Sequence, residues 1–233
     1  MGKSSKRYRS AAEKVDPAKS YELREALALI QGLPPAKFDE TVDVVIKLGI
    51  DPRKSDQAVR GAVSLPKGLG KDVNVIVFAE GDKAEAAKAA GANEVGSADL
   101  ADKISGGWTD FDVVIASPDM MKHVGKLGRV LGPQGKMPSP KSGTVTPDVA
   151  KAVEEFKAGK VEFRTDAGGN IHAPLGKRSF PLEDLETNLR AFLDHVVGAR
   201  PSSVKGVFMR KVSVSTTMGP GAWIEFTEAG ASA

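Results

Sequence analysis

The spacing of hydrophobic residues changes twice along this chain, and that change constrains the fold more than any other feature. Residues 41–48 (TVDVVIKL) carry apolar side chains at every second position, the pattern of a strand with one buried face. After the glycine- and proline-containing stretch 66–70, residues 73–78 (VNVIVF) are almost continuously apolar, as in strands buried on both faces of a parallel sheet. One-face alternation returns at Val161 and Phe163. The pattern indicates two kinds of sheet in one chain.

The middle of the chain alternates between strand and helix patterns. An alanine-rich stretch at residues 82–90 and a second stretch at 99–104 predict helices, and residues 111–116 predict a buried strand. Residues 147–157 predict a further helix, closed by Gly159. Alternating strands and helices are typical of an open parallel sheet, so we expect a Rossmann-like α/β domain over residues 69–159.

The two outer segments predict amphipathic helices and strands with one buried face. Ser20 is placed to cap a helix that ends at Gly32, and Pro181 opens a second helix that ends at Gly198. A hairpin is expected around residues 166–169. Further strands are expected at 59–65, 161–164, 171–173, 208–214 and 223–226. Neither segment is expected to cover its own sheet, so residues 1–68 and 160–233 are predicted to form one discontinuous antiparallel α+β domain.

Composition excludes several classes of protein. With 41% hydrophobic and 27% charged residues the chain is globular, and no apolar run approaches the roughly 20 residues of a membrane span. The absence of cysteine excludes disulfides and thiolate metal sites, and the three histidines are scattered. We therefore expect no membrane contact, no metal and no cofactor, in a soluble protein that stays in the cytoplasm.

Positive charge is concentrated towards the N-terminus, where residues 1–68 hold 13 Lys/Arg against 9 Asp/Glu. Lys3, Lys6, Arg7 and Arg9 are interpreted as a solvated or disordered tail, with a weaker alternative as a binding element. The last residues, 227–233, are expected to be disordered.

Catalytic patterns do not occur in this sequence. His123, His172 and His195 lie in separate predicted elements, and neither H-E-x-x-H nor G-x-S-x-G is present. The first strand of the inserted domain leads into Ala79-Glu80-Gly81-Asp82 rather than into a glycine fingerprint for nucleotides. A nucleotide-dependent enzyme is thus a weak alternative, as is a basic RNA chaperone without a defined site.

Two short motifs leave a structural and a functional interpretation open. Phe38, which begins the stretch Lys37–Val42 (KFDETV), is either a core residue or a base-stacking residue beside a phosphate-binding Lys37, with Thr41 supplying a hydroxyl. In Ser213–Gly221 (SVSTTMGPG), the hydroxyls either cap a β-turn or meet ribose 2′-OH groups. In the second case Gly219 would let a foreign backbone approach.

A third motif is a basic, glycine-rich run with no acid between Asp119 and Asp148. It carries Lys122, Lys126, Arg129, Lys136 and Lys141. The spacing of a phosphate-binding P-loop is missing, because Met137 follows the lysine and the glycines are wrongly spaced. Residues 125–141 are predicted to be a loop. Two interpretations of this loop remain open: a secondary RNA contact, or a purely structural loop shaped by its glycines and prolines.

Long blocks of this sequence resemble the bacterial type of the ribosomal protein L1 family. They are Lys37–Val42, Leu48–Lys71, Gly125–Val145, the hairpin Lys160–Pro174 and Thr216–Gly221 (TTMGPG), within a similarity that spans most of the chain. The resemblance implies the same discontinuous domain with a hinged Rossmann-like insert.

The resemblance also implies a function. Members of the family bind the mobile L1 stalk of 23S ribosomal RNA near the tRNA exit (E) site, assist the release of deacylated tRNA and repress their own operon by binding its mRNA. The other expected partners are large-subunit components, and the free protein is expected to be a non-enzymatic monomer. The predicted RNA-binding residues are Lys37, Phe38, Thr41, Ser215, Thr217, Met218 and Gly219, together with Arg164 and Lys177.

Overall fold

The computed structural model describes residues 5–54 and 56–226, so Lys3 and residues 227–233 lie outside the described residues. The chain forms two compact units, which are described separately: an outer unit of residues 1–70 and 161–233, and an inserted unit of residues 71–160. These divisions fall one or two residues after the boundaries expected from the sequence, 68/69 and 159/160.

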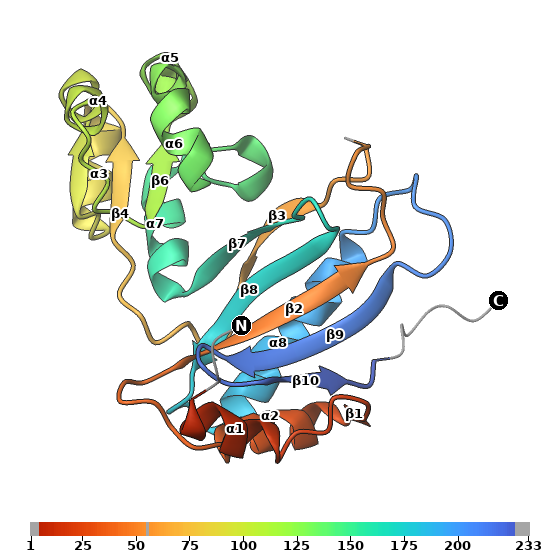
Figure 1. The fold of residues 1–233 in the computed structure, drawn as a ribbon. Helices are drawn as coiled ribbons and strands as arrows, with labels where there is room; N and C mark the ends of the chain where they lie inside the picture. Colours follow the sequence, from red (N-terminus) through yellow and green to blue (C-terminus); the bar gives the residue numbers. More distant parts are fainter. Residues whose placement is uncertain (1–4, 55, 227–233) are drawn as a thin grey trace. The chain divides into compact units, whose positions relative to one another are not determined.

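A five-stranded sheet forms the centre of the outer unit (Figure 1). The order of its strands is β1 (Ser20–Tyr21), β10 (Gly221–Ile224), β9 (Met209–Thr216), β2 (Thr41–Leu48) and β8 (Asn170–Lys177). Neighbouring strands are antiparallel except β1, which runs parallel to β10. A separate two-stranded sheet pairs β3 (Arg60–Ser64) with β7 (Lys160–Arg164).

Two helices, α2 (Leu23–Gln31) and α8 (Leu182–Gly198), cover one face of the large sheet and also contact each other. The predicted stripe of α8 is buried there, including Leu185, Leu189 and Phe192. Strand β2 alternates strictly between buried and partly exposed residues, because every second side chain enters this core. Its other face, which carries Thr41, Asp43, Val45 and Lys47, remains partly open.

Two sequence-based expectations in the outer unit are wrong, and a third is confirmed only in part. Ser20 does not cap a helix, since it pairs with Trp223 in β1, and Glu22 takes the N-cap position of α2. The basic tail forms helix α1 (Lys6–Ala12), anchored by the buried Ala11. The hairpin expected at residues 166–169 forms at its turn, where the Asp166 N–H donates to the Asn170 carbonyl at 2.9 Å and the Gly169 N–H donates to the Asp166 carbonyl at 3.1 Å. It does not continue as a ladder between β7 and β8, which belong to different sheets. One isolated bridge, Thr165 to Ile171, joins them.

The inserted unit contains a parallel three-stranded sheet in the order β5 (Glu94–Gly96), β4 (Val75–Phe78), β6 (Val113–Ala116). All four residues of β4 are buried, as the continuous apolar run predicts. Helices α3 (Asp82–Ala89) and α7 (Val149–Ala158) share one core with the sheet, and α4 (Ala98–Ser105) shares another with the segments after β6. The mixed α/β and α+β fold class is therefore confirmed.

The basic glycine-rich run is helical where a loop was predicted. After β6 the chain forms η1 (Pro118–Met120), α5 (Met121–Val124), η2 (Gly125–Leu127) and α6 (Gly128–Gln134), and η3 (Pro140–Ser142) follows. The physical reason is that Val124, Leu127 and Leu131 recur at helical spacing and are buried in one core. Gly135, with φ at 73°, ends α6 in the left-handed region.

Candidate nucleic-acid interface

Most of the predicted RNA-binding residues lie where three strands of the outer unit end together. Thr41 begins β2 and pairs with Lys177, the last residue of β8. Thr216, the last residue of β9, pairs with Val42, so the turn that follows it lies beside the start of β2. We call this region the strand-end surface; it comprises Lys37, Phe38, Thr41, Lys177, Ser215, Thr217, Met218 and Gly219.

The hydroxyl groups of the strand-end surface are partly engaged within the protein. The Thr217 hydroxyl accepts a hydrogen bond from the Thr41 backbone N–H at 3.0 Å, and the Thr217 N–H donates to the Thr41 carbonyl at 3.0 Å. The Lys177 ammonium donates to the Thr41 hydroxyl at 3.2 Å. Capping of the turn thus accounts for part of the role of the Thr217 hydroxyl. Thr217 is nevertheless exposed to solvent.

Two large apolar side chains project from this region into solvent. Phe38 is 55% exposed and Met218 is 52% exposed, so the interpretation of Phe38 as a core residue is wrong. Lys37, beside Phe38, is also exposed. Exposed apolar groups of this size next to a cation are suited to stacking on bases, while the cation meets phosphate.

A buried carboxylate, Glu40, connects the segments that carry these side chains. It is only 1% exposed, and it accepts hydrogen bonds from the backbone N–H groups of Ala36 at 2.8 Å and Met218 at 3.1 Å. Arg178 also donates to it, at 3.3 Å. Burial opposes the charged form, but the bonds from Ala36, Thr216, Met218 and Arg178 outweigh it, so the pKa of Glu40 lies below its ordinary value.

Two arginines extend this network to the chain segments around it. Besides Glu40, Arg178 binds the carbonyl of Gln31 at 2.6 Å and the carbonyl of Leu33. Arg7 in α1 donates to the Met218 carbonyl at 2.8 Å and lies 3.8 Å from Glu40. The residue interpreted as part of a disordered tail therefore helps to hold the Met218 turn.

Packing inside the protein leaves no room for a side chain at Gly219. A Cβ atom at this position would stand 2.4 Å from the Thr216 hydroxyl oxygen, which is closer than van der Waals contact allows. Its backbone N–H donates to the Thr216 carbonyl at 3.0 Å. Internal packing thus explains the residue without the approach of a foreign backbone.

Ser215 and Asp43 face each other across β9 and β2 on the open side of the sheet. Burial raises the pKa of Asp43, although the nearby His172 and Lys177 act in the opposite direction. The open face next to the strand-end surface therefore carries an acid as well as hydroxyls and a cation.

Arg164 is the predicted residue that the fold does not bring to this surface. Its neighbour Thr165 bridges to Ile171, which pairs with Ile46 in β2. Ile46 is five residues from Thr41, or about 17 Å along an extended strand. Arg164 thus belongs to the other end of the sheet.

Sequence reasoning missed Glu40, Arg178 and Arg7. Glu40 follows Asp39 in an ordinary polar stretch, and nothing local marks it as buried. Its partners are 4, 33, 138 and 178 residues away along the chain.

The strand-end surface thus combines two exposed apolar side chains with hydroxyls and lysines. In the described part of the chain no group of three or more His, Cys, Asp or Glu residues could hold a metal ion. Among the same residues, no helix is both long and apolar enough to cross a bilayer.

Comparison with known proteins identifies the family. The model of the ribosomal protein L1p/L10e family matches residues 28–220. The chain is 55% identical over 228 residues to large ribosomal subunit protein uL1 of Protochlamydia amoebophila, covering 98% of this chain and 97% of the relative. For the proteins of the same name from Cutibacterium acnes and Bordetella pertussis the identities are 58% and 57%, covering 96% and 97% of each chain. This chain belongs to the ribosomal protein L1 family, whose members are structural ribosomal proteins and not enzymes.

Proposed function

We propose that this protein is a component of the large ribosomal subunit, located on cytoplasmic ribosomes, and that it binds folded 23S ribosomal RNA at the L1 stalk. The names of its relatives support assembly into the large subunit. The site proposed for the RNA is the strand-end surface, with Arg164 as a more distant contact.

The observation that carries this proposal is the pair of exposed side chains Phe38 and Met218, presented by backbone that the buried Glu40 holds on both sides. Two large apolar groups that stay in solvent add nothing to the core, and such groups are typical of binding surfaces. Hydroxyls and lysines around them match the 2′-OH and phosphate groups of RNA. Anchored backbone also lowers the entropic cost of binding, because less has to be ordered.

Two finer roles follow from the same site. The protein would repress its own operon by binding an mRNA structure that presents the same contacts as the stalk. Near the E site it would assist the release of deacylated tRNA by moving with the stalk. If one surface serves both rRNA and mRNA, the two RNAs must compete for it.

A competition assay tests the proposal at physiological salt. Labelled stalk RNA should be displaced by unlabelled stalk RNA and by the operon mRNA fragment, but only weakly by bulk RNA. Uniform displacement by every RNA would indicate a chaperone without a defined site. Retention of a labelled nucleotide by the purified protein would instead favour a nucleotide-dependent enzyme built on the inserted unit.

A further inference from the structure

The inserted unit has a cavity at the end of its sheet where β4 and β6 finish. Its volume is about 300 Å³, and it is lined by the segments that follow the two strands, through Glu80, Asp82, Lys83, Ser117, Asp119 and Met120. β4 and β6 are parallel neighbours, and both point the same way in Figure 1. The chain leaves β4 for β5 on one side, whereas beyond β6 it returns on the other side, at the bridge from Val145 to Ala116. Open parallel sheets bind ligands at such a point, where the connections diverge.

The hydroxyl of Ser117 faces this cavity without a partner in the protein. Ser117 is only 2% exposed, and its backbone is held on both sides: its N–H donates to the Phe78 carbonyl, and its carbonyl accepts from the Met120 N–H, both at 3.0 Å. Among the residues that the structure describes, its hydroxyl forms no hydrogen bond, and it does not cap η1. In contrast, the buried hydroxyls of Ser142 and Thr144 bond to each other at 3.0 Å. A buried hydroxyl without a protein partner is unfavourable unless a ligand or water reaches it from the cavity.

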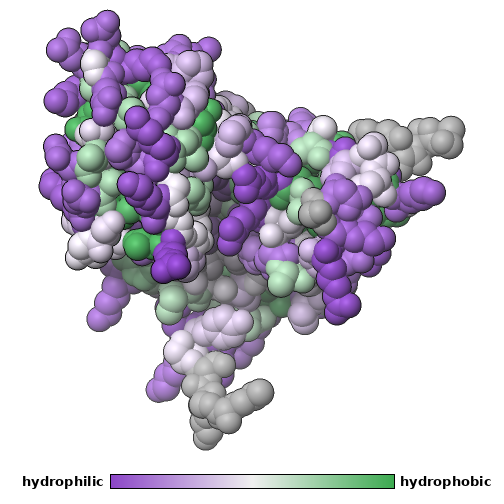
Figure 2. Space-filling view, turned by 90° about the horizontal axis from the view of Figure 1, so that it is seen from above, coloured by the Kyte–Doolittle hydropathy of each residue, from purple (hydrophilic) through white to green (hydrophobic). Residues whose placement is uncertain are grey.

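The lining of the cavity is acidic. Glu80, Asp82 and Asp119 contribute three negative charges against the single positive charge of Lys83, which leaves a formal charge of −2. Hydrophilic residues cover most of the surface seen in Figure 2, so what distinguishes this cavity is the sign of its charge and not its polarity. The positive N-terminal end of α3 favours Asp82 in its first turn, but Glu80 and Asp119 lie outside that helix. The Lys83 ammonium lies 3.4 Å from Asp119, so the cavity already accepts one cation at its edge. Its charge disfavours an anionic ligand and favours a cation.

We propose that this cavity binds a hydrated magnesium ion. In the described part of the chain no three acids lie close enough together to enclose a bare ion, and the cavity is far larger than such an ion. Magnesium fits these two facts, because it gives up its water reluctantly and is bound through one or two carboxylates with several waters retained. Asp82 and Asp119 accept hydrogen bonds from that water on the two sides of the cavity, and the Ser117 hydroxyl completes the shell. The bound ion ties the start of α3 to the segment after β6. This site is independent of the proposed RNA-binding function.

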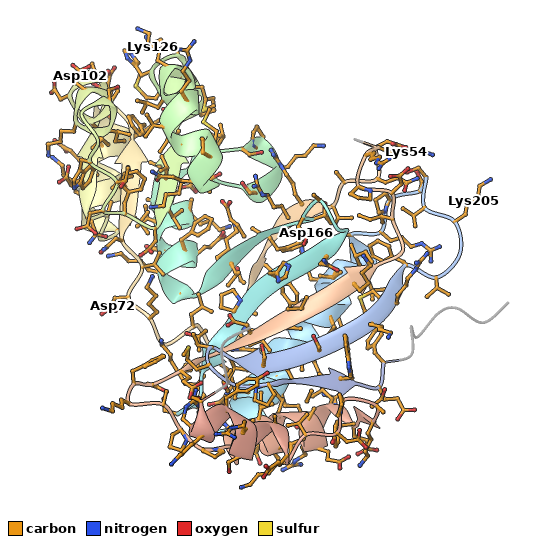
Figure 3. The ribbon with its side chains drawn as sticks, in the orientation of Figure 1. Lys54, Asp72, Asp102, Lys126, Asp166 and Lys205 are labelled. Carbon is orange, nitrogen blue, oxygen red and sulfur yellow. The ribbon has the colours of Figure 1, made fainter. Side chains whose placement is uncertain are left out.

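The test uses the full chain, labelled for NMR, with Mn²⁺ as a paramagnetic probe, since manganese takes the same oxygen ligands in the same octahedral geometry. Small amounts of Mn²⁺ should broaden the amide signals of residues 80–83 and 117–120 before those of any other segment, and excess Mg²⁺ should restore them. Asp119→Asn should weaken the apparent affinity for Mn²⁺ roughly 10-fold. A matched control, Asp99→Asn/Asp102→Asn, removes two exposed acids from α4 of the same unit, which do not line the cavity, and should bind Mn²⁺ like the parent (Figure 3 shows Asp102).

Two further variants separate ion binding from folding. Ser117→Ala removes a hydroxyl that has no partner in the protein, so its Tm without metal should not fall below that of the parent, while its affinity for Mn²⁺ should fall. Lys83→Gln removes the ammonium that competes for Asp119, so its affinity for Mn²⁺ should rise several-fold. In the parent, but not in Asp119→Asn, the Tm should increase with the concentration of Mg²⁺, because the ion binds only the folded protein. A merely structural role of these residues would predict no change in metal affinity.

Several outcomes would overturn the magnesium site. Broadening spread evenly over the acids of the inserted unit, or an equal loss of affinity in the α4 control, would show that diffuse attraction explains the effect. Parent-like affinity in either Ser117→Ala or Asp119→Asn would also overturn it. If spermidine shifted the same amide signals and Mg²⁺ did not, the cavity would bind an organic cation, and the proposal of a metal ion would be wrong. The preference for stalk RNA is measured separately by the competition assay, so its failure would contradict the proposed function alone.

Discussion

The carboxylate of Glu40 accepts a hydrogen bond from the backbone N–H of Met218 at 3.1 Å, across 178 residues of sequence. The other oxygen of the same carboxylate accepts from the N–H of Ala36 at 2.8 Å, two residues before Phe38. One buried acid thus orders the two segments that present the exposed Phe38 and Met218. The geometry of the strand-end surface depends on a residue that lies beneath it.

Replacing Glu40 by glutamine should destabilise the protein by about 3 kcal/mol, because Arg178 loses its buried counter-charge. In addition, one carboxylate oxygen becomes an NH₂ group that faces the backbone N–H of either Ala36 or Met218. The free energy of unfolding from denaturant titration measures the effect. The control Glu183→Gln removes the same charge from a side chain that is 84% exposed and should change stability by a few tenths of a kcal/mol. Equal stabilities of parent and Glu40→Gln would contradict the role assigned to this acid.

The contribution of Glu40 to stability should depend on pH. Because folding lowers its pKa from an ordinary value of 4.5, its contribution is fully present above that pH and is lost as the pH falls through the folded pKa. The difference in unfolding free energy between parent and Glu40→Gln should therefore be largest near pH 6 and shrink below pH 4.5. A difference that stays constant down to pH 3 would show that charge on Glu40 is not what stabilises the fold.

Phe38→Ala should weaken stalk RNA binding by about 1 to 3 kcal/mol, the range for one base stacked on an aromatic ring. Its Tm should stay near that of the parent, since the side chain is largely solvated. The control Val207→Ala shortens another apolar side chain of the outer unit, which is 62% exposed, and should leave RNA affinity unchanged. Lys37→Ala should differ from Phe38→Ala by lowering the salt slope by roughly 0.7 to 0.9.

Thr217→Val should reduce both stability and RNA affinity, because the deleted hydroxyl accepts the Thr41 N–H at 3.0 Å. The expected loss of stability is about 1 kcal/mol, at the low end for an unpaired donor since water can reach this exposed position. Thr217→Ser keeps the hydroxyl and serves as the control in the same unfolding and RNA titrations. If Thr217→Val binds stalk RNA like the parent at every salt concentration, the hydroxyl only caps the turn.

Replacing residues 71–160 by a short Gly/Ser linker should leave a folded protein that still prefers stalk RNA. The reason is that the core of the outer unit is built from residues of the two outer segments alone. Circular dichroism and RNA competition would test folding and preference. An unfolded product would contradict the proposal that the outer segments form an independent domain.

The sequence by itself determined which face is buried in those elements whose hydrophobic period is clear. The alternation in residues 41–48 predicted β2, the continuous apolar run predicted the buried β4, and the stripe from Leu185 to Val196 predicted α8. Such patterns are local, since they depend only on the period of the backbone and on the tendency of apolar side chains to leave water. They also indicated both kinds of sheet before any tertiary contact was known.

Only the tertiary structure decided which of these elements become neighbours and which polar groups are buried between them. Ser20 lies in a strand because its backbone pairs with that of Trp223, which is distant in the sequence. β7 forms its ladder with β3, about 100 residues earlier in the chain, and is joined to the following β8 only by the hairpin turn and one bridge from Thr165 to Ile171. Arg7, Glu40 and Arg178 form one network because folding brings three segments together around a single carboxylate. The local hydrophobic period cannot predict these long-range contacts. Each contact requires the closure of a long loop, and the buried charge of Glu40 is compensated only by partners from elsewhere in the chain.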